Sequence, residues 1–261
     1  MKKVTRRKFL YQLPSAGLMS IAVPSILNAA SRQSDPSLQE TSKSFTILFQ
    51  GDSITDGNRG RTADPNHIMG HGYAFSIASR LGADYPERNL KFINKGISGN
   101  TVADLAARWQ TDTFDLKPDV ISILVGVNDV YFKFKNGNSS APDDFESAYR
   151  KLLSSTRETL PNALLILGEP FVLPVGMVKE NLDQWNQAIE EKQKVVKKLS
   201  AEFNTVFVEY QQVFSKACKR ASADYWIWDG IHPTVPGHEL MTRAWLTEAG
   251  KHLPIITPKN K

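Results

Sequence analysis

Short apolar runs and helical patterns alternate along this chain from Phe45 onward, and this alternation limits the fold more than any other feature of the sequence. Five short runs are rich in apolar residues, and glycine, proline or polar residues flank them, as is typical of buried strands. These runs are Phe45–Gln50, Leu90–Asn94, Val120–Val125, Leu164–Leu167 and Val206–Val208.

Apolar residues recur at helical spacing between and after these runs. The predicted helices cover residues 73–81, 102–109, 145–160, 182–203, 210–217 and 236–250. Regular alternation of strands and helices requires a parallel sheet with right-handed crossovers. We therefore predict an α/β fold class, a three-layer doubly wound five-stranded parallel sheet with helices on both faces, in a single domain.

The amino terminus has the three-part layout of an export signal. Basic residues come first, a mostly apolar stretch runs from Leu10 to Leu27, and small residues follow. The adjacent Arg6 and Arg7 resemble a twin-arginine signal, and an ordinary secretory signal is the alternative. We predict an export signal over 1–30, a linker over 31–44, the folded domain over 45–254 and a tail over 255–261. The protein is then exported, either to the periplasm or beyond it.

The net charge of +5 does not describe the folded domain. Residues 1–30 contain five basic and no acidic residues, and the rest of the chain contains 27 of each sign. The predicted domain therefore gives no electrostatic reason to expect nucleic acid, a membrane surface or a polyanion as a partner. The single cysteine, Cys218, excludes an intramolecular disulfide.

Neither a cofactor nor a metal is expected from the sequence. The first strand is followed by no phosphate loop and no Gly-x-Gly-x-x-Gly pattern, which argues against nucleotide binding. His67 and His71 have the spacing of metal ligands on a helix, but they lie in a loop-like stretch without further ligand candidates.

Polar and glycine-rich segments follow the predicted strands. Ser53 comes just after the first strand, 96–100 after the second, 126–129 after the third, and 229–233 before the last helix. In a parallel sheet these segments meet at one edge, the carboxyl ends of the strands, where open α/β sheets bind ligands.

These segments contain the groups that nucleophilic catalysis at a carbonyl needs. Ser53 is the candidate nucleophile and His232 the candidate base. Asp229, three residues before His232, can orient the imidazole. Candidate donors for an oxyanion are the backbone N–H groups of Gly99 and Ser53 and the side-chain amide of Asn128.

The four segments stand as GDSITDG, NKGISGNT, GVND and DGIHP, and together they resemble the SGNH (GDSL) hydrolase family. The resemblance runs from Phe45 to about Ala249 and implies the flavodoxin-like SGNH hydrolase fold. It implies the same catalytic roles for Ser53, Asp229 and His232, with Ser53, Gly99 and Asn128 forming the oxyanion hole.

Two longer runs, NKGISGNTVADLAARW and WDGIHPTVPGH, are similar to those of carbohydrate esterases of this family, in particular acetylxylan esterases. This resemblance implies removal of O-acetyl groups from an acetylated oligo- or polysaccharide. Trp228, Asp52 and Tyr131 are the candidate substrate-binding residues. The alternative for the two aromatic residues is packing within their own loops, and for Asp52 it is fixing the turn at Ser53 by hydrogen bonds. The loops 57–72, 130–141 and 171–179 are expected to border the site.

Two other functions remain open at this point. A lysophospholipase or thioesterase on the same fold would need a long apolar groove, and the bordering loops are polar and glycine-rich except around Leu173–Val178. A catalytically inactive carbohydrate-binding protein would be expected to have lost at least one of the four catalytic side chains, and all are present. Whether the protein forms a homo-oligomer is also open.

Overall fold

The computed structural model describes residues 44–135 and 144–253. The predicted export signal, the linker up to residue 43 and the predicted tail lie outside this part of the chain. Within it, no helix is long and apolar enough to cross a membrane.

A five-stranded parallel sheet forms the centre of the folded part, in the order β2-β1-β3-β4-β5. The strands are β1 (Phe45–Gly51), β2 (Leu90–Asn94), β3 (Val120–Leu124), β4 (Leu164–Gly168) and β5 (Val206–Val208). Every residue of β3 is buried, as expected for a central strand covered on both faces. The predicted fold class is confirmed, and each predicted strand matches an observed one to within a residue.

Helices cover both faces of the sheet. The longer ones are α2 (Tyr73–Asp84), α3 (Val102–Ala107), α5 (Val127–Lys135), α6 (Phe145–Thr159), α8 (Leu182–Glu202), α9 (Tyr210–Ala217) and α11 (Val235–Ala249). One-turn helices are α1 (Ser53–Asp56), α4 (Trp109–Asp112), α7 (Gly176–Lys179) and α10 (Ala223–Trp226). Short 3-10 turns are η2 (Pro86–Arg88), η3 (Phe114–Leu116) and η4 (Gly250–His252).

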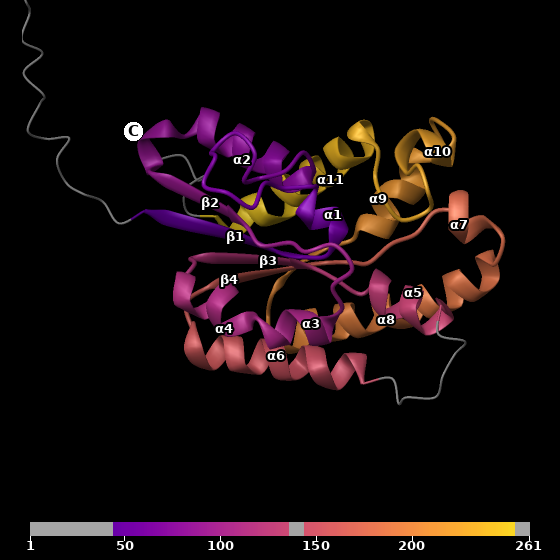
Figure 1. Ribbon diagram of the computed structural model, residues 1–261, viewed down its shortest axis with the longest axis horizontal. Coiled ribbons are helices and arrows are strands. Elements are labelled where there is room, and N and C mark those ends of the chain that lie inside the picture. The colour runs from indigo at the N-terminus through magenta and orange to yellow at the C-terminus, as the bar shows by residue number, and fades with distance from the viewer. Residues whose placement is uncertain (1–43, 136–143, 254–261) are drawn as a thin grey trace, which may run out of the picture. The chain divides into compact units, whose positions relative to one another are not determined.

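Two hydrophobic cores lie on opposite faces of the sheet. Figure 1 shows α2 and α11 on one face, with α3, α4 and α6 on the other. The first core packs Tyr73 of α2 and Trp245 of α11 against Phe49 of β1. The second packs Trp109 of α4 and Leu153 of α6 with inward-facing residues of β3 and β4.

Three predicted segments differ from the structure. The expected loop 171–179 ends in the one-turn helix α7. Residues 130–135, expected as part of a loop, continue the helix α5, which begins directly after Gly126. The helix expected over 102–109 is divided at Arg108 into α3 and α4. The apolar stripe continues across this division, because Val102, Leu105 and Trp109 all enter the second core.

Candidate active site

Ser53 is the first residue of α1, immediately after β1. Asp52 caps this one-turn helix, and its Oδ1 accepts a hydrogen bond of 3.0 Å from the backbone N–H of Ile54. Gly51 allows the tight turn, because a Cβ there would lie 2.3 Å from the carbonyl oxygen of Leu124 and 2.4 Å from Oγ1 of Thr55. The turn thus presents Ser53 at the carboxyl end of the sheet.

The structure brings Ser53, His232 and Asp229 into one hydrogen-bonded chain. Oγ of Ser53 lies 2.7 Å from Nε2 of His232, although 179 residues separate the two in sequence. Nδ1 of His232 lies 2.6 Å from Oδ2 of Asp229. Oδ1 of Asp229 accepts hydrogen bonds from the backbone N–H groups of Ile231 and His232, at 3.0 and 2.7 Å. This arrangement has the connectivity of a serine nucleophile, a base and an orienting carboxylate.

The loop that carries Asp229 and His232 is held by the segment leading into α7. The N–H of Leu173 donates to the carbonyl of Gly230, and the N–H of Met177 donates to the carbonyl of Asp229, each at 3.0 Å. Gly176 has a positive φ of 51°, and a Cβ on it would lie 2.3 Å from the carbonyl oxygen of Asp229. The close approach requires glycine there. The imidazole is therefore fixed from outside its own loop.

The charges of this group favour an ionised carboxylate beside a basic imidazole. Burial alone would raise the pKa of Asp229, but hydrogen bonds from the side chain and backbone of His232 and the backbone of Ile231 bring it below its usual value. The hydrogen bond that His232 donates to Asp229 raises the pKa of His232 above its usual 6.5, against the opposing effect of burial. A base of this kind can take the proton of the Ser53 hydroxyl near neutral pH.

The candidate oxyanion donors come from the two loops beside Ser53. Gly99 has a positive φ of 85°, and a Cβ on it would meet no atom within 4 Å, so the space on that side of its Cα is open. Asn128, near the start of α5, donates from Nδ2 to the carbonyl of Asn100 at 3.1 Å. The Gly99 loop is tied to the serine turn because the N–H of Ile97 donates to the carbonyl of Gly51 at 3.0 Å. The oxyanion roles of Ser53, Gly99 and Asn128 stay predictions.

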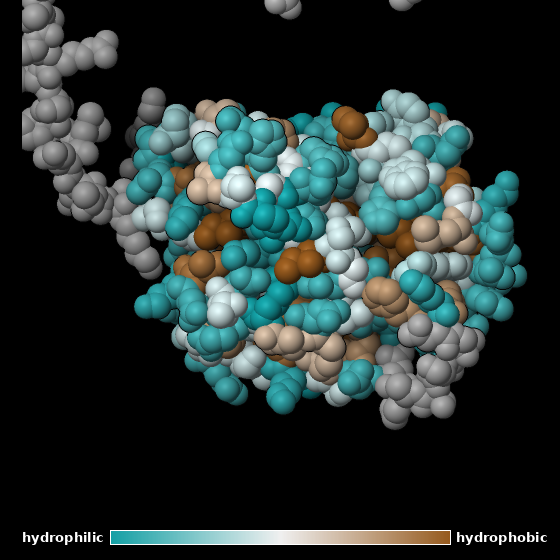
Figure 2. Space-filling model, in the orientation of Figure 1, coloured by the Kyte–Doolittle hydropathy of each residue, from teal (hydrophilic) through white to brown (hydrophobic). Residues whose placement is uncertain are grey.

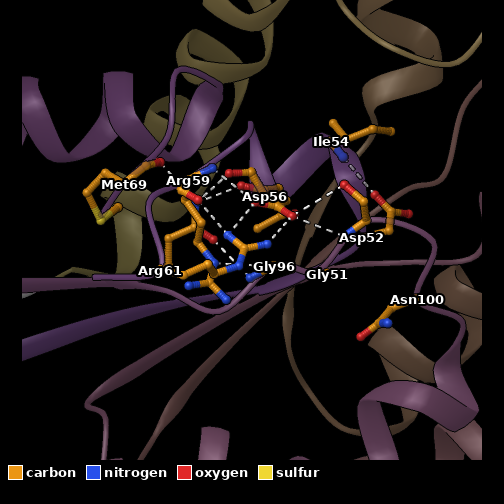
Figure 3. A network of polar contacts seen from close by, with 12 residues as sticks. Gly51, Asp52, Ile54, Asp56, Arg59, Arg61, Met69, Gly96 and Asn100 are labelled. Carbon is orange, nitrogen blue, oxygen red and sulfur yellow. Dashed lines mark hydrogen bonds and ion pairs between the residues drawn. The ribbon is translucent and has the colours of Figure 1, made fainter. Parts of the chain in front are cut away.

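A polar network around Asp56, which the sequence did not reveal, joins the serine turn to the loop after β2 (Figure 3). Oδ2 of Asp56 accepts hydrogen bonds from the backbone N–H of Ser98 at 3.1 Å and from Arg61 at 2.7 Å. Arg59 donates from Nε to the carbonyl of Gly96 at 2.9 Å. The available signal was an aspartate followed within five residues by two arginines in GDSITDGNRGR.

The three predicted substrate-binding residues have different surroundings. Trp228 is 65% exposed, and its ring stacks beside that of His232, with centroids 6.0 Å apart and planes inclined by 25°. Tyr131 is half-buried on α5 and packs edge-to-face on Phe132. Asp52 is 1% exposed, which disfavours direct contact with substrate and assigns its side chain to the serine turn.

The described residues contain no cluster of three or more metal-ligating side chains.

Comparison with known proteins identifies the class. The chain belongs to the GDSL-like lipase/acylhydrolase family, whose model matches residues 49–240. It is 36% identical to an acetylxylan esterase of Geobacillus stearothermophilus over 210 residues, covering 78% of this chain and 93% of that one. The resemblance seen in the four sequence blocks is confirmed, and the protein is a carboxylic ester hydrolase.

Solved structures agree with this class. A GDSL-like lipase from Parabacteroides merdae matches with a TM-score of 0.76 and 41% identity, over 80% of this chain and 96% of that one. The Geobacillus acetylxylan esterase matches with a TM-score of 0.70 and 34% identity, over 82% and 97%. Further structures of that esterase are of variants described as catalytic mutants, in which an aspartate, a serine or a histidine is replaced by alanine.

Proposed function

We propose that the protein removes O-acetyl groups from acetylated carbohydrate, such as xylan or its oligosaccharides, through an acyl-enzyme on Ser53. The observation that carries the proposal is the Ser53–His232–Asp229 chain, with contacts of 2.7 and 2.6 Å. The similarity to an acetylxylan esterase supports the substrate class. In keeping with the predicted export signal, we propose that the enzyme acts outside the cytoplasm.

The proposed reaction follows from the roles of these groups. His232 takes the proton of the Ser53 hydroxyl as Oγ attacks the ester carbonyl, and Asp229 stabilises the resulting imidazolium. The negative charge on the carbonyl oxygen is stabilised by hydrogen bonds from the N–H groups of Ser53 and Gly99 and from the amide of Asn128. His232 then protonates the departing sugar hydroxyl, and water releases acetate by the same steps in reverse.

Trp228 supports a carbohydrate substrate in this proposal. Its indole is exposed beside the imidazole of His232, where a sugar ring carrying the acetyl group would lie. Aromatic faces of this kind offer a rigid apolar surface, and the indole N–H adds a polar group.

The lipid-hydrolase alternative has less support. The apolar stretch that borders the site contributes to the core, because Leu173 is 4% and Val178 0% exposed. On the face that Figure 2 shows, the strongly apolar residues lie in small separate groups. The inactive-protein alternative is disfavoured because the serine, histidine and aspartate are hydrogen-bonded to one another.

A substrate panel tests the proposal. Acetate release from acetylated xylo-oligosaccharides is compared with hydrolysis of synthetic esters of increasing acyl length, for the native protein and for Ser53→Ala. We expect acetate release, a preference for short acyl chains, and loss of nearly all activity in Ser53→Ala. A preference for long acyl chains without acetate release would support the lipid alternative. Full activity in Ser53→Ala would refute the mechanism.

A further inference from the structure

Arg108 lies between α3 and α4, and its guanidinium reaches the end of β1 and the loop after β2. Its side chain is 15% exposed. The guanidinium donates from Nε to Oδ1 of Asn100 at 2.8 Å, from Nη1 to Oε1 of Gln50 at 2.9 Å, and from Nη2 to the carbonyl of Gly51 at 3.4 Å. One side chain thus contacts both β1 and the loop after β2.

The acceptors of Arg108 are close neighbours of all three candidate oxyanion donors. Asn100 directly follows Gly99, and its carbonyl accepts the 3.1 Å hydrogen bond from the amide of Asn128. Gly51 lies two residues before Ser53, and Asn100 lies beneath the Gly51–Asp52 turn in Figure 3. A displacement of Arg108 would therefore reach Ser53, Gly99 and Asn128 together.

The surroundings of Arg108 fix its orientation. Asp112 accepts hydrogen bonds from Nη1 of Arg108 at 3.0 Å and from Nζ of Lys95 at 2.8 Å. Gln50 donates from Nε2 to the carbonyl of Asp112 at 2.9 Å and to Oγ1 of Thr113 at 2.8 Å, which leaves its Oε1 to face Arg108. A planar guanidinium with several fixed donors suits this set of acceptors, and the point charge of a lysine does not reproduce it.

We propose that Arg108 is a positioning residue that sets the three oxyanion donors in their working geometry through Asn100 and the end of β1. The inference rests on the proposed function, since it concerns the same reaction. Pre-set donors stabilise charge that appears only in the transition state, so their displacement lowers kcat more than it changes KM.

The test uses Arg108→Lys, which keeps the charge, and Asn100→Ala, which removes the side-chain acceptor and keeps the carbonyl that Asn128 contacts. We expect kcat to fall about tenfold to a hundredfold in each, less than the ~10²–10³ for loss of a donor itself, with KM changed little. Because Arg108 acts partly through Asn128, the fall caused by Arg108→Lys should be smaller in an Asn128→Ala background than in the native protein.

Arg157→Lys is the matched control. Arg157 is also partly buried, but it donates to the carbonyls of Ala163, Phe203 and Asn204, remote from Ser53 along the strands. We expect this variant to lose stability and to keep kcat. Thermal unfolding of each variant separates loss of fold from loss of rate, and Asn100→Ala carries the test if Arg108→Lys does not fold.

The positioning role would be overturned if a folded Arg108→Lys kept the kcat of the native protein. It would also be overturned if Arg108→Lys lowered kcat by the same factor in the Asn128→Ala background as in the native protein. An equal fall of kcat in Arg157→Lys would do the same, because the effect would then be general to buried arginines. The proposed function is tested separately, by the activity of Ser53→Ala.

Discussion

The carboxyl group of Asp52 is buried directly behind the candidate nucleophile. One oxygen caps α1, while Oδ2 has no hydrogen-bond partner among residues 44–135 and 144–253. Burial raises the pKa of Asp52 from 3.8 to about 7, a hydrogen bond from Ile54 and the charge of His232 oppose the rise, and Asp129 adds to it. The folded protein therefore keeps this carboxyl neutral where an unfolded chain would ionise it.

This shift predicts a pH-dependent contribution of Asp52 to stability. The contribution is complete below pH 3.8 and is lost as the pH rises toward about 7, since the unfolded state releases the proton first. At about 1.4 kcal/mol per unit, the loss is on the order of 4 kcal/mol. Asp52→Asn stays neutral and retains the oxygen that caps Ile54. We expect its advantage over the native protein in urea unfolding to grow across this range; a constant difference would contradict the assignment.

The sequence predicted which three side chains come together better than it predicted the contacts that support them. Ser53, Asp229 and His232 could be assigned because each residue type has a definite chemical role next to a strand or before the last helix. The contacts of Asp56 and Arg108 could not, because they join loops that are distant in sequence. Hydrogen bonds between such loops leave no periodic signal in the chain.

Among the elements, strands were easier to predict than the short helices. A run such as Val120–Leu124 is apolar throughout because both faces of β3 are buried, so it can be recognised without tertiary information. The start of α5 contains Asn128 and Asp129, which also suit a turn. Its helical state depends on packing, since Val127 and Val130 are buried in the first core.

The contact between α7 and the loop that carries Asp229 and His232, here called the histidine loop, gives a prediction for this pair of segments. Gly176→Ala would place a Cβ against the carbonyl of Asp229 and would force an alanine into a positive φ of 51°. We expect it to lower the free energy of unfolding by more than about 1 kcal/mol and to reduce kcat by displacing Asp229.

Gly82→Ala is the control for this substitution, because Gly82 lies within α2 and a Cβ there would meet only Phe92, at 3.6 Å. We expect this change to preserve kcat and to stabilise the helix by about 0.5–1 kcal/mol. Chemical unfolding and steady-state kinetics measure both effects. If Gly176→Ala behaved like Gly82→Ala, α7 would not hold the histidine loop.

Across the whole folded part, each core contains a buried indole with a specific partner. Trp245 donates to Oγ of Ser122 at 3.0 Å in the first core, and Trp109 donates to Oγ1 of Thr156 at 2.9 Å in the second. Replacing either by phenylalanine should cost about 1–3 kcal/mol through the lost hydrogen bond. Because the sheet separates the two, the costs in Trp109→Phe/Trp245→Phe should add within about 0.5 kcal/mol in urea unfolding. A larger departure would mean that strain passes through the sheet.

The fold as a whole was accessible from sequence because its strands and helices alternate in order. Parallel strands with right-handed crossovers leave few arrangements for five such units. The division between α3 and α4 at Arg108 could not be predicted from the sequence pattern, because the apolar stripe is continuous through both helices.

The order of parts along the chain also has a consequence for biosynthesis. Ser53 is translated 179 residues before His232, and the helix that packs Trp245 against β1 follows His232. A nascent chain that ends before His232 would carry the nucleophile without its base, and without α11 one face of the sheet would lack part of its cover. Ester cleavage would thus begin only after His232 and α11 have been translated and have packed on the sheet.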